Sequence, residues 1–470
     1  MYSIFLLTSN IMKATTSAIL LCSGTSSRMF PFSNKFMFEF LGKSVFRYQM
    51  ENLLQQKTIN EIFIVTNFEN KEKIEAEISE YFSDFSQFQK KITCTIQENL
   101  SNGMKDGVLS VEKIFPKNDN ILIISSNDMV ENWFLSDFLE KDTSSQICGK
   151  VCGKTVENYF PGGYLEIDSE KNVKKIIEKP GEGNEPSNLI NLVIHWFQDS
   201  QKVFELLKSV NNSDDDAYEL MIQELINNSY SKNQYVKSIE YTGKWQALKY
   251  PWHILDMKNF MFETQSNKNM NLNNSNTYSI EKHENCFISK NAVLNCENGN
   301  IIIEEGVKIF DFAVISGPCF IGKNSIIGNH CLVRESHIGE SCCIGHGTEI
   351  ARSYLRDTVF THQSYIGDSV VDNNVNFGAG CRTGNLRHDY GKVSVLVKNS
   401  VINSGKTKLG IFCGSDSKFG INTSFAPGII VGKNCWAYPH LFINKNIKEN
   451  SFVKQIKASL ELDIRENKNK

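Results

Sequence analysis

The chain has 470 residues, too many for one hydrophobic core, which predicts two or three domains. Hydrophobic residues make up 41% of the sequence, charged residues 22%, and the formal net charge is −3. A charge this close to zero argues against a partner such as nucleic acid or an anionic membrane. The 13 cysteines form no C-x-x-C pairs and have no histidines at zinc-ligand spacing, which indicates reduced thiols in a cytoplasmic protein.

The first residues contain an apolar run that resembles part of a signal peptide. It has no basic segment before it and ends at Leu7, and no stretch of the chain approaches the roughly 20 apolar residues of a membrane span. We therefore expect a soluble, cytoplasmic protein in which residues 1–16 are an N-terminal extension. Met12 is an equally good first residue, because the fold pattern begins just after it.

Residues 17–262 alternate short apolar runs with longer amphipathic ones. The runs typical of buried strands are Ala18–Cys22, Ile62–Val65, Ile92–Ile96 and Ile121–Ser125. The runs with helical spacing are Val45–Gln55, Lys71–Tyr81 and Asp106–Ile114. This alternation predicts an α/β domain with a Rossmann-like, largely parallel mixed sheet, with ligands at the carboxyl ends of its strands.

Residues 263–284 are polar and rich in asparagine, which predicts a linker. Beyond it, apolar residues recur every six positions in two series, with a one-residue slip before Ile338. The first series is Ile303, Ile309, Ile315, Ile321, Ile327, Val333, Ile338, Ile344 and Ile350, and the second is Cys413, Phe419, Phe425, Val431, Ala437 and Ile443. A period of six favours a left-handed parallel β-helix over residues 285–455 rather than a β-sandwich. For the tail, residues 456–470, we expect a short helix or a frayed end.

A loop of small residues follows the first predicted strand and contains Arg28, and Lys35 comes seven residues later. Such loops let backbone N–H groups approach phosphates. The segment LLCSGTSSRMF…NK…GKS resembles the opening motif of the sugar-1-phosphate nucleotidyltransferases, with Ser26 in place of its second glycine and Asn34 in place of a proline.

The resemblance to the nucleotidyltransferases continues in order to about residue 262. It implies catalytic roles for Arg28 and Lys35 and a Mg²⁺ ligand at Asp128. The nucleotide-binding residues that it implies are Leu21, Ser23, Gly24, Gln97, Gly103 and Met104, and the sugar-binding ones are Gly163, Glu178 and Asn191. The family usually has a second metal ligand near the end of the domain, where this sequence has Ala247, so the nucleotidyl transfer activity is open to question.

The predicted β-helix contains the run Thr361-His362-Gln-Ser-Tyr365-Ile-Gly-Asp, followed by Asn-Phe-Gly-Ala-Gly-Cys-Arg-Thr-Gly-Asn at 376–385. These runs resemble the bifunctional UDP-N-acetylglucosamine pyrophosphorylase/glucosamine-1-phosphate N-acetyltransferases. The resemblance implies that His362 is the general base of acetyl transfer. It further implies a set of sugar-binding residues, Arg334, Glu349, Tyr365 and Asn376, and a set that binds the co-substrate acetyl-CoA, Asn385, Ile421 and Asn422. A lysine of the family is replaced by Ala351, with Arg352 adjacent.

These features predict an enzyme that binds three small molecules: a nucleoside triphosphate, a sugar-1-phosphate and acetyl-CoA. The first hypothesis is a bifunctional transferase that makes UDP-N-acetylglucosamine and assembles as a homotrimer, as the resemblance implies. A second is a single-function nucleotidyltransferase, for glucose-1-phosphate or a similar sugar, whose β-helix is structural. A third is a protein with one inactive domain, which Ala247 and Ala351 keep open.

Overall fold

The computed structural model describes residues 15–82, 90–142, 144–210, 217–273 and 278–455. The described chain forms two compact units. The first unit contains Asn34–Phe38, Lys43–Ala247 and the described residues up to Thr25, and the second contains Ser26–Ser33, Glu39–Gly42 and the residues from Leu248 onward. Within the described residues, no helix is long and apolar enough to span a lipid bilayer.

The first unit is built on a mixed sheet whose main strands run in the order β10-β9-β11-β6-β1-β4-β5, with β8 paired to β11 and β12 paired to β8. Strands β6, β1, β4 and β5 are parallel, and β11 runs antiparallel to β6. The strands are β1 (Thr16–Leu21), β4 (Ile59–Thr66), β5 (Lys91–Ile96), β6 (Asn120–Ser125), β8 (Ile147–Thr155), β9 (Gly163–Ile167), β10 (Val173–Glu178), β11 (Leu189–Phe197) and β12 (Tyr235–Glu240). The predicted Rossmann-like mixed sheet is confirmed.

Helices cover both faces of this sheet, because successive strand residues point to opposite sides. Ala18 and Leu20 belong to one buried cluster, together with residues of α1, α2 and α4, whereas Ile19 and Leu21 belong to another, with residues of α3, α5 and α6. The helices are α1 (Val45–Gln55), α2 (Lys71–Tyr81), α3 (Gly103–Leu109), α4 (Trp133–Glu140), α5 (Ser200–Ser209) and α6 (Ala217–Tyr230). The smaller elements of this unit are η1 (Lys35–Met37), β3 (Lys43–Ser44), β7 (Asp128–Val130) and β13 (Trp245–Ala247), and β2 (Glu39–Phe40) belongs to the second unit.

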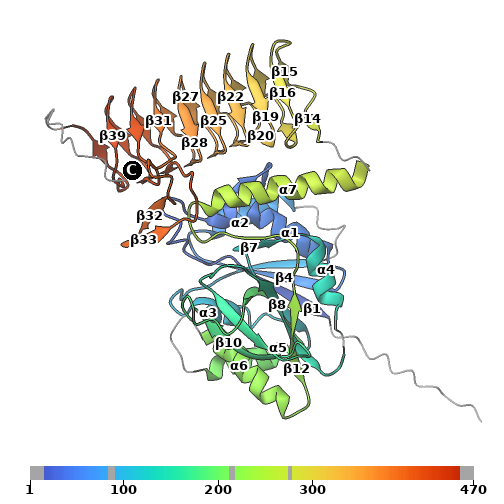
Figure 1. Ribbon diagram of the computed structural model, residues 1–470. Coiled ribbons are helices and arrows are strands. Elements are labelled where there is room, and N and C mark those ends of the chain that lie inside the picture. The colour runs from blue at the N-terminus through green and yellow to red at the C-terminus, as the bar shows by residue number, and fades with distance from the viewer. Residues whose placement is uncertain (1–14, 83–89, 143, 211–216, 274–277, 456–470) are drawn as a thin grey trace, which may run out of the picture. The chain divides into compact units, whose positions relative to one another are not determined.

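The second unit contains a three-sided parallel β-helix, the yellow to red strands of Figure 1, whose sides we call the first, second and third faces. The first face is β14 (Ile280–Lys282), β17 (Ile301–Ile303), β20 (Cys319–Ile321), β23 (His337–Ile338), β26 (Tyr354–Leu355), β29 (Val370–Val371), β34 (Phe412–Cys413) and β37 (Ile430–Val431). The second face is β15 (Phe287–Ile288), β18 (Lys308–Ile309), β21 (Ile326–Ile327), β24 (Cys343–Ile344), β27 (Phe360–Thr361), β30 (Asn376–Phe377), β35 (Lys418–Phe419), β38 (Trp436–Ala437) and β40 (Phe452–Val453). The third face is β16 (Val293–Asn295), β19 (Val314–Ser316), β22 (Leu332–Arg334), β25 (Glu349–Ala351), β28 (Tyr365–Gly367), β31 (Arg382–Thr383), β36 (Ser424–Phe425) and β39 (Phe442–Ile443).

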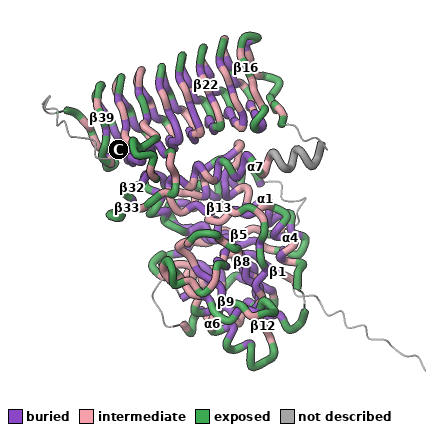
Figure 2. The backbone as a smooth tube through the Cα atoms, in the orientation of Figure 1, coloured by how far each residue is buried: buried purple, intermediate pink, exposed green. Residues whose placement is uncertain are grey.

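The residues of the six-residue repeat form the core of this β-helix. Each face contributes one residue of the predicted series per turn, and these residues belong to a single buried cluster. Figure 2 shows this as buried backbone repeating along the coil between intermediate and exposed segments. The predicted left-handed β-helix is therefore confirmed. Its regular turns are interrupted between β31 and β34 by an insertion that contains the hairpin of β32 (Ser394–Val397) and β33 (Ser400–Asn403).

The expected domain bounds need correction near the linker. Helix α7 (His253–Asn273) crosses the predicted boundary at 262 and takes up half of the expected linker, so the polar asparagine-rich run does not exclude helix. The β-helix begins at Ile280 rather than at 285, because β14 already pairs with β17. In the first unit, α3 begins and ends earlier than the predicted 106–114, and the apolar spacing after it continues through turns. The tail and most of the N-terminal extension lie outside the described residues.

Candidate functional site

The predicted nucleotide-binding residues gather at the carboxyl end of β1. The Ser23 hydroxyl donates to Gln97 Oε1, and Gln97 Nε2 donates to the Gly103 carbonyl over 2.7 Å. A side chain on Gly107 of α3 would place its Cβ 3.0 Å from Gln97 Oε1 and 3.2 Å from Leu21 Cδ2. Leu21, Ser23, Gln97 and Gly103 therefore share one edge of the sheet, the edge at which such folds bind ligands.

The loop after β1 is open at Gly24, where an added Cβ would have no heavy atom within 4 Å. Asn67 Nδ2 holds the loop by donating to the Ser23 carbonyl over 2.9 Å. Ser26, which replaces the second glycine of the motif, has a φ of 54°, in the left-handed region that favours glycine. Ser26 thus has a backbone conformation typical of the glycine that it replaces. Met104 follows Gly103 in α3 and packs against the buried cluster on that side of the sheet.

The two predicted phosphate-binding cations fall in different units. Arg28 is exposed and lies in Ser26–Ser33, which belongs to the second unit, whereas Lys35 begins η1 in the first unit. Their convergence on one triphosphate stays a prediction.

Asp128 begins β7 and is directly opposite Ala247 of β13 in an antiparallel pair. Residues opposite one another in such a pair have Cβ atoms about 4.5–5.5 Å apart. The indole N–H of Trp245 donates to Asp128 Oδ1 over 3.0 Å, and Gln49 Nε2 donates to the Asp128 carbonyl over 2.7 Å. The sequence departure at Ala247 therefore lies beside the candidate metal ligand itself, where alanine supplies no oxygen.

The donor set around Asp128 still fits Mg²⁺ in one way. Mg²⁺ is commonly bound by one or two carboxylates, with the remaining oxygens from substrate phosphates and water. Asp128 can supply one carboxylate, and the described residues contain no group of three or more His, Cys, Asp or Glu side chains suited to a metal. A Mg²⁺ ion here would therefore need the phosphates of a bound nucleotide.

The three predicted sugar-binding residues of the first unit lie together. Gly163 of β9 pairs with Glu178 of β10, and a Cβ on Gly163 would lie 2.9 Å from Glu178 Oε2 and 3.5 Å from Asn191 Cβ. Behind Asn191, the ring of His195 lies 2.9 Å from Asn191 Oδ1 and 2.9 Å from the Tyr218 hydroxyl. Burial lowers the pKa of His195 to about 3, so this histidine is neutral and orients Asn191.

The predicted acetyl-transfer residues lie along the third face of the β-helix and its edges. Glu349, Tyr365 and Arg382 are consecutive outward residues of one row across β25, β28 and β31. Arg334 reaches this row from β22, because its Nη2 donates to Glu349 Oε1 over 2.7 Å. A carboxylate, a phenol and guanidinium groups are thus presented on one surface.

His362 is exposed at the corner between the second and third faces. A Cβ on Gly345 would lie 2.6 Å from His362 Nδ1, so the imidazole covers the turn before its own. Ile421 and Asn422 occupy this corner two turns later, since the Gly380 N–H donates to the His362 carbonyl and the Asn422 N–H to the Ala379 carbonyl. The predicted base and two predicted acetyl-CoA residues share one edge. Asn376 is half-buried on β30, whose strand leads into the same corner.

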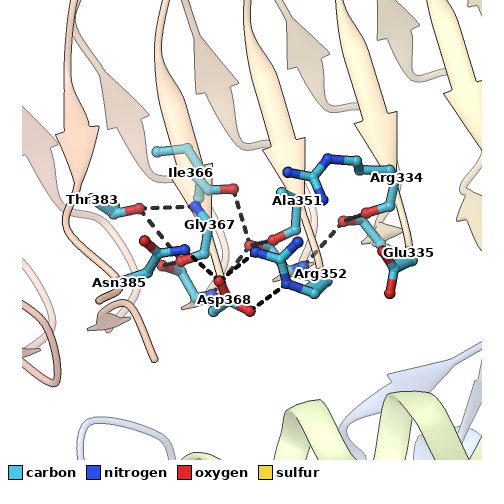
Figure 3. A network of polar contacts seen from close by, with 12 residues as sticks. Arg334, Glu335, Ala351, Arg352, Ile366, Gly367, Asp368, Thr383 and Asn385 are labelled. Atoms are coloured by element: carbon cyan, nitrogen blue, oxygen red, sulfur yellow. Dashed lines mark hydrogen bonds and ion pairs between the residues drawn. The ribbon is translucent and has the colours of Figure 1, made fainter. Parts of the chain in front are cut away.

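Asn385 belongs to a polar network at the opposite edge of the third face (Figure 3). Its Nδ2 donates to the Tyr365 hydroxyl over 3.0 Å and to Asp368 Oδ2 over 2.5 Å. Asp368 also accepts two bonds from Arg352, over 2.7 and 2.8 Å, and this pairing raises the pKa of Arg352. Ala351, at the position of the family lysine, is completely buried.

Sequence reasoning assigned no role to Asp368, Trp245 or His195. Asp368 stands in the quoted motif, three residues after Tyr365, and this place in the motif was its signal. Trp245 lies two residues before Ala247, but its bond to Asp128 depends on the pairing of β13 with β7. His195 had no signal in the sequence, because its partner Tyr218 lies 23 residues away on α6.

The first unit gathers the predicted nucleotide-binding residues at the carboxyl edge of its sheet, and the β-helix exposes His362 at one corner. Together they define a transferase with two domains. The family model described as nucleotidyl transferase matches residues 17–250. "Bifunctional protein GlmU" of Methanocaldococcus jannaschii is 30% identical over 443 residues, covering 93% of this chain and 97% of that protein. "Bifunctional sugar-1-phosphate nucleotidylyltransferase/acetyltransferase" of Sulfurisphaera tokodaii is 31% identical over 445 residues, covering 93% and 99%. The chain belongs to this family of bifunctional sugar-1-phosphate nucleotidylyltransferase/acetyltransferases.

Proposed function

We propose that this transferase makes UDP-N-acetylglucosamine in two steps. The second unit transfers an acetyl group from acetyl-CoA to glucosamine-1-phosphate, and the first unit transfers a uridylyl group from UTP to the N-acetylated product. The observation that carries the proposal is that His362, Tyr365 and Glu349 lie on adjoining parts of one surface. The nucleotidyl transferase family model that matches residues 17–250 supports the uridylyl transfer, and the bifunctional relatives support both reactions.

In the acetyl transfer, the sugar amine attacks the thioester carbonyl of acetyl-CoA, a C–N bond forms and the coenzyme A thiolate leaves. The amine must lose a proton, which the exposed imidazole of His362 takes as general base. Glu349 binds the amino group before attack. Asn385 holds the Tyr365 hydroxyl in place, and Arg352 and Asp368 hold Asn385.

In the uridylyl transfer, a phosphate oxygen of the sugar attacks the α-phosphorus of UTP and pyrophosphate leaves. The open backbone at Gly24 admits the phosphates, Gln97 contacts the base, and Gly163, Glu178 and Asn191 bind the sugar. Arg28 and Lys35 neutralise phosphate charge. Asp128 and the substrate phosphates would hold a Mg²⁺ ion, which would supply further charge neutralisation.

The functional form that we propose is a homotrimer in which the β-helices pack side by side. Large apolar side chains are exposed on the second face, the third face and the corner between them: Phe287, Val293, Phe312, Phe360, Ile421, Trp436, Tyr438, Phe442 and Phe452. Exposed apolar surface of this extent is typical of a protein interface. Burial between neighbouring β-helices would also enclose the corner that bears His362.

A paired assay tests the two halves. One arm supplies glucosamine-1-phosphate and acetyl-CoA and follows free thiol, and the other supplies UTP, N-acetylglucosamine-1-phosphate and magnesium and follows pyrophosphate. We expect both products, and Asp128→Asn should lower pyrophosphate release at least about tenfold while thiol release is unchanged. Thiol without pyrophosphate, with any common nucleoside triphosphate, would mean that the alanine at 247 has left the first unit inactive. Pyrophosphate without thiol would favour the single-function alternative.

A further inference from the structure

Arg382 differs from every other arginine of the β-helix in its partners. Arg334, Arg352, Arg356 and Arg387 each pair with a carboxylate, at N–O distances of 2.6–3.2 Å. Among the five arginines of the described residues 280–453, Arg382 is the one without a carboxylate partner. Its Nη1 donates to the carbonyls of Gln363, over 2.7 Å, and Cys381, over 3.1 Å. The rest of the guanidinium is left to donate to another group.

These two bonds fix where the charge is. Because Nη1 reaches the Gln363 carbonyl, the guanidinium lies at the corner beside His362, the residue before Gln363. The next outward residue of the row is Ser424, whose small side chain leaves space on that side. An exposed, preorganised cation therefore stands next to the proposed general base.

The row of Glu349, Tyr365 and Arg382 also places a negative and a positive side chain at a distance that suits a sugar phosphate. Glu349 and Arg382 flank Tyr365 at two strand spacings from one another, which is about 9–10 Å between backbones. Side chains from both ends can then hold a sugar that carries an amino group and a phosphate on adjacent carbons. Arg334 and Arg352 each donate to a carboxylate, whereas Arg382 donates only to backbone carbonyls and keeps its full positive charge for a dianion.

We propose that Arg382 binds the phosphate of the amino-sugar phosphate during acetyl transfer, in place of the lysine that Ala351 replaces. The inference rests on the proposed function, which names that substrate. A forked guanidinium suits a phosphate because two N–H groups can donate to two oxygens at once. The resemblance to the bifunctional transferases assigns no role to Arg382.

The test compares acceptors with and without the phosphate. Arg382→Ala should raise the KM for glucosamine-1-phosphate about 10–100-fold, the range expected for a lost charged hydrogen-bond pair. With glucosamine as acceptor, the variant and the wild-type protein should have the same kcat/KM. Arg382→Lys should be intermediate, since it keeps the charge and loses the fork. Lys433→Ala, a cation paired with Glu449 away from the row, is the control.

Two outcomes would overturn the proposal. A rise in the KM for acetyl-CoA alone would assign Arg382 to the coenzyme phosphates, and an equal loss with both acceptors would make its role structural. Calorimetric titration with glucosamine-1-phosphate in the absence of acetyl-CoA measures binding of the sugar phosphate independently of acetyl transfer. If the wild-type protein binds the sugar phosphate but releases no thiol, the proposed function fails, and weaker binding by Arg382→Ala would still support the phosphate site. No binding by the wild-type protein would end both.

Discussion

At the scale of single residues, a substitution of His362 distinguishes a catalytic β-helix from a purely structural one. Replacement by alanine should lower thiol release about 10²–10⁴-fold, the usual contribution of a positioned general base. The melting temperature should be unchanged, because the side chain is exposed and the buried cluster of the β-helix does not include it. Enzyme kinetics and thermal unfolding on the same preparation provide the measurement.

His346→Ala is the matched control for His362. His346 is exposed at the same corner one turn earlier, where its carbonyl accepts from the Gln363 N–H over 3.0 Å. Its loss should leave thiol release within about twofold of the wild-type rate, far below the effect of losing a general base. Equal turnover in the two variants at the wild-type rate would remove His362 from the mechanism, and a lowered melting temperature in His362→Ala alone would indicate a structural role.

At the scale of elements, β21 tests what stabilises the β-helix. Ile327 is completely buried in the core cluster, whereas its neighbour Ile326 points outward and is half-buried. Ile327→Ala should lower the free energy of unfolding by about 2–5 kcal/mol, because it deletes buried methyl groups and leaves a cavity. Ile326→Ala removes the same atoms from the outer surface and should cost less than half as much. Denaturant unfolding of both variants measures the difference. Equal losses in the free energy of unfolding would contradict a core made of the inward residues of the six-residue repeat.

At the scale of the whole molecule, the exposed apolar residues predict assembly. Light scattering at micromolar concentration should give three times the 53.4 kDa of one chain. Phe442→Glu should shift the mass toward the monomer, because this side chain is 66% exposed in one chain and a charge at an interface core is unfavourable. A mass near 53.4 kDa for the wild-type protein would refute the trimer and leave the corner of His362 open to solvent.

Much of the architecture could be predicted because it depends on local patterns. Helices α1 and α2 have the predicted bounds, since their apolar spacing repeats within one element. The six-residue repeat predicted the β-helix because each inward residue packs against the equivalent residue of the next turn. The motif residues Leu21, Ser23 and Gln97 meet because the carboxyl ends of parallel strands lie at one edge of a sheet.

The features that only the tertiary structure decided depend on register between distant segments. The antiparallel pairing of β7 with β13 places Ala247 opposite Asp128, although 118 residues separate them in the chain, and one step of slip would have turned that side chain away. Arg352 follows Ala351, which stands where the family has a lysine, and the structure pairs this arginine with Asp368. Arg382 acquires its place beside His362 only when successive turns stack. A sequence specifies which residues each strand contains, and the alignment of strands decides which side chains face one another.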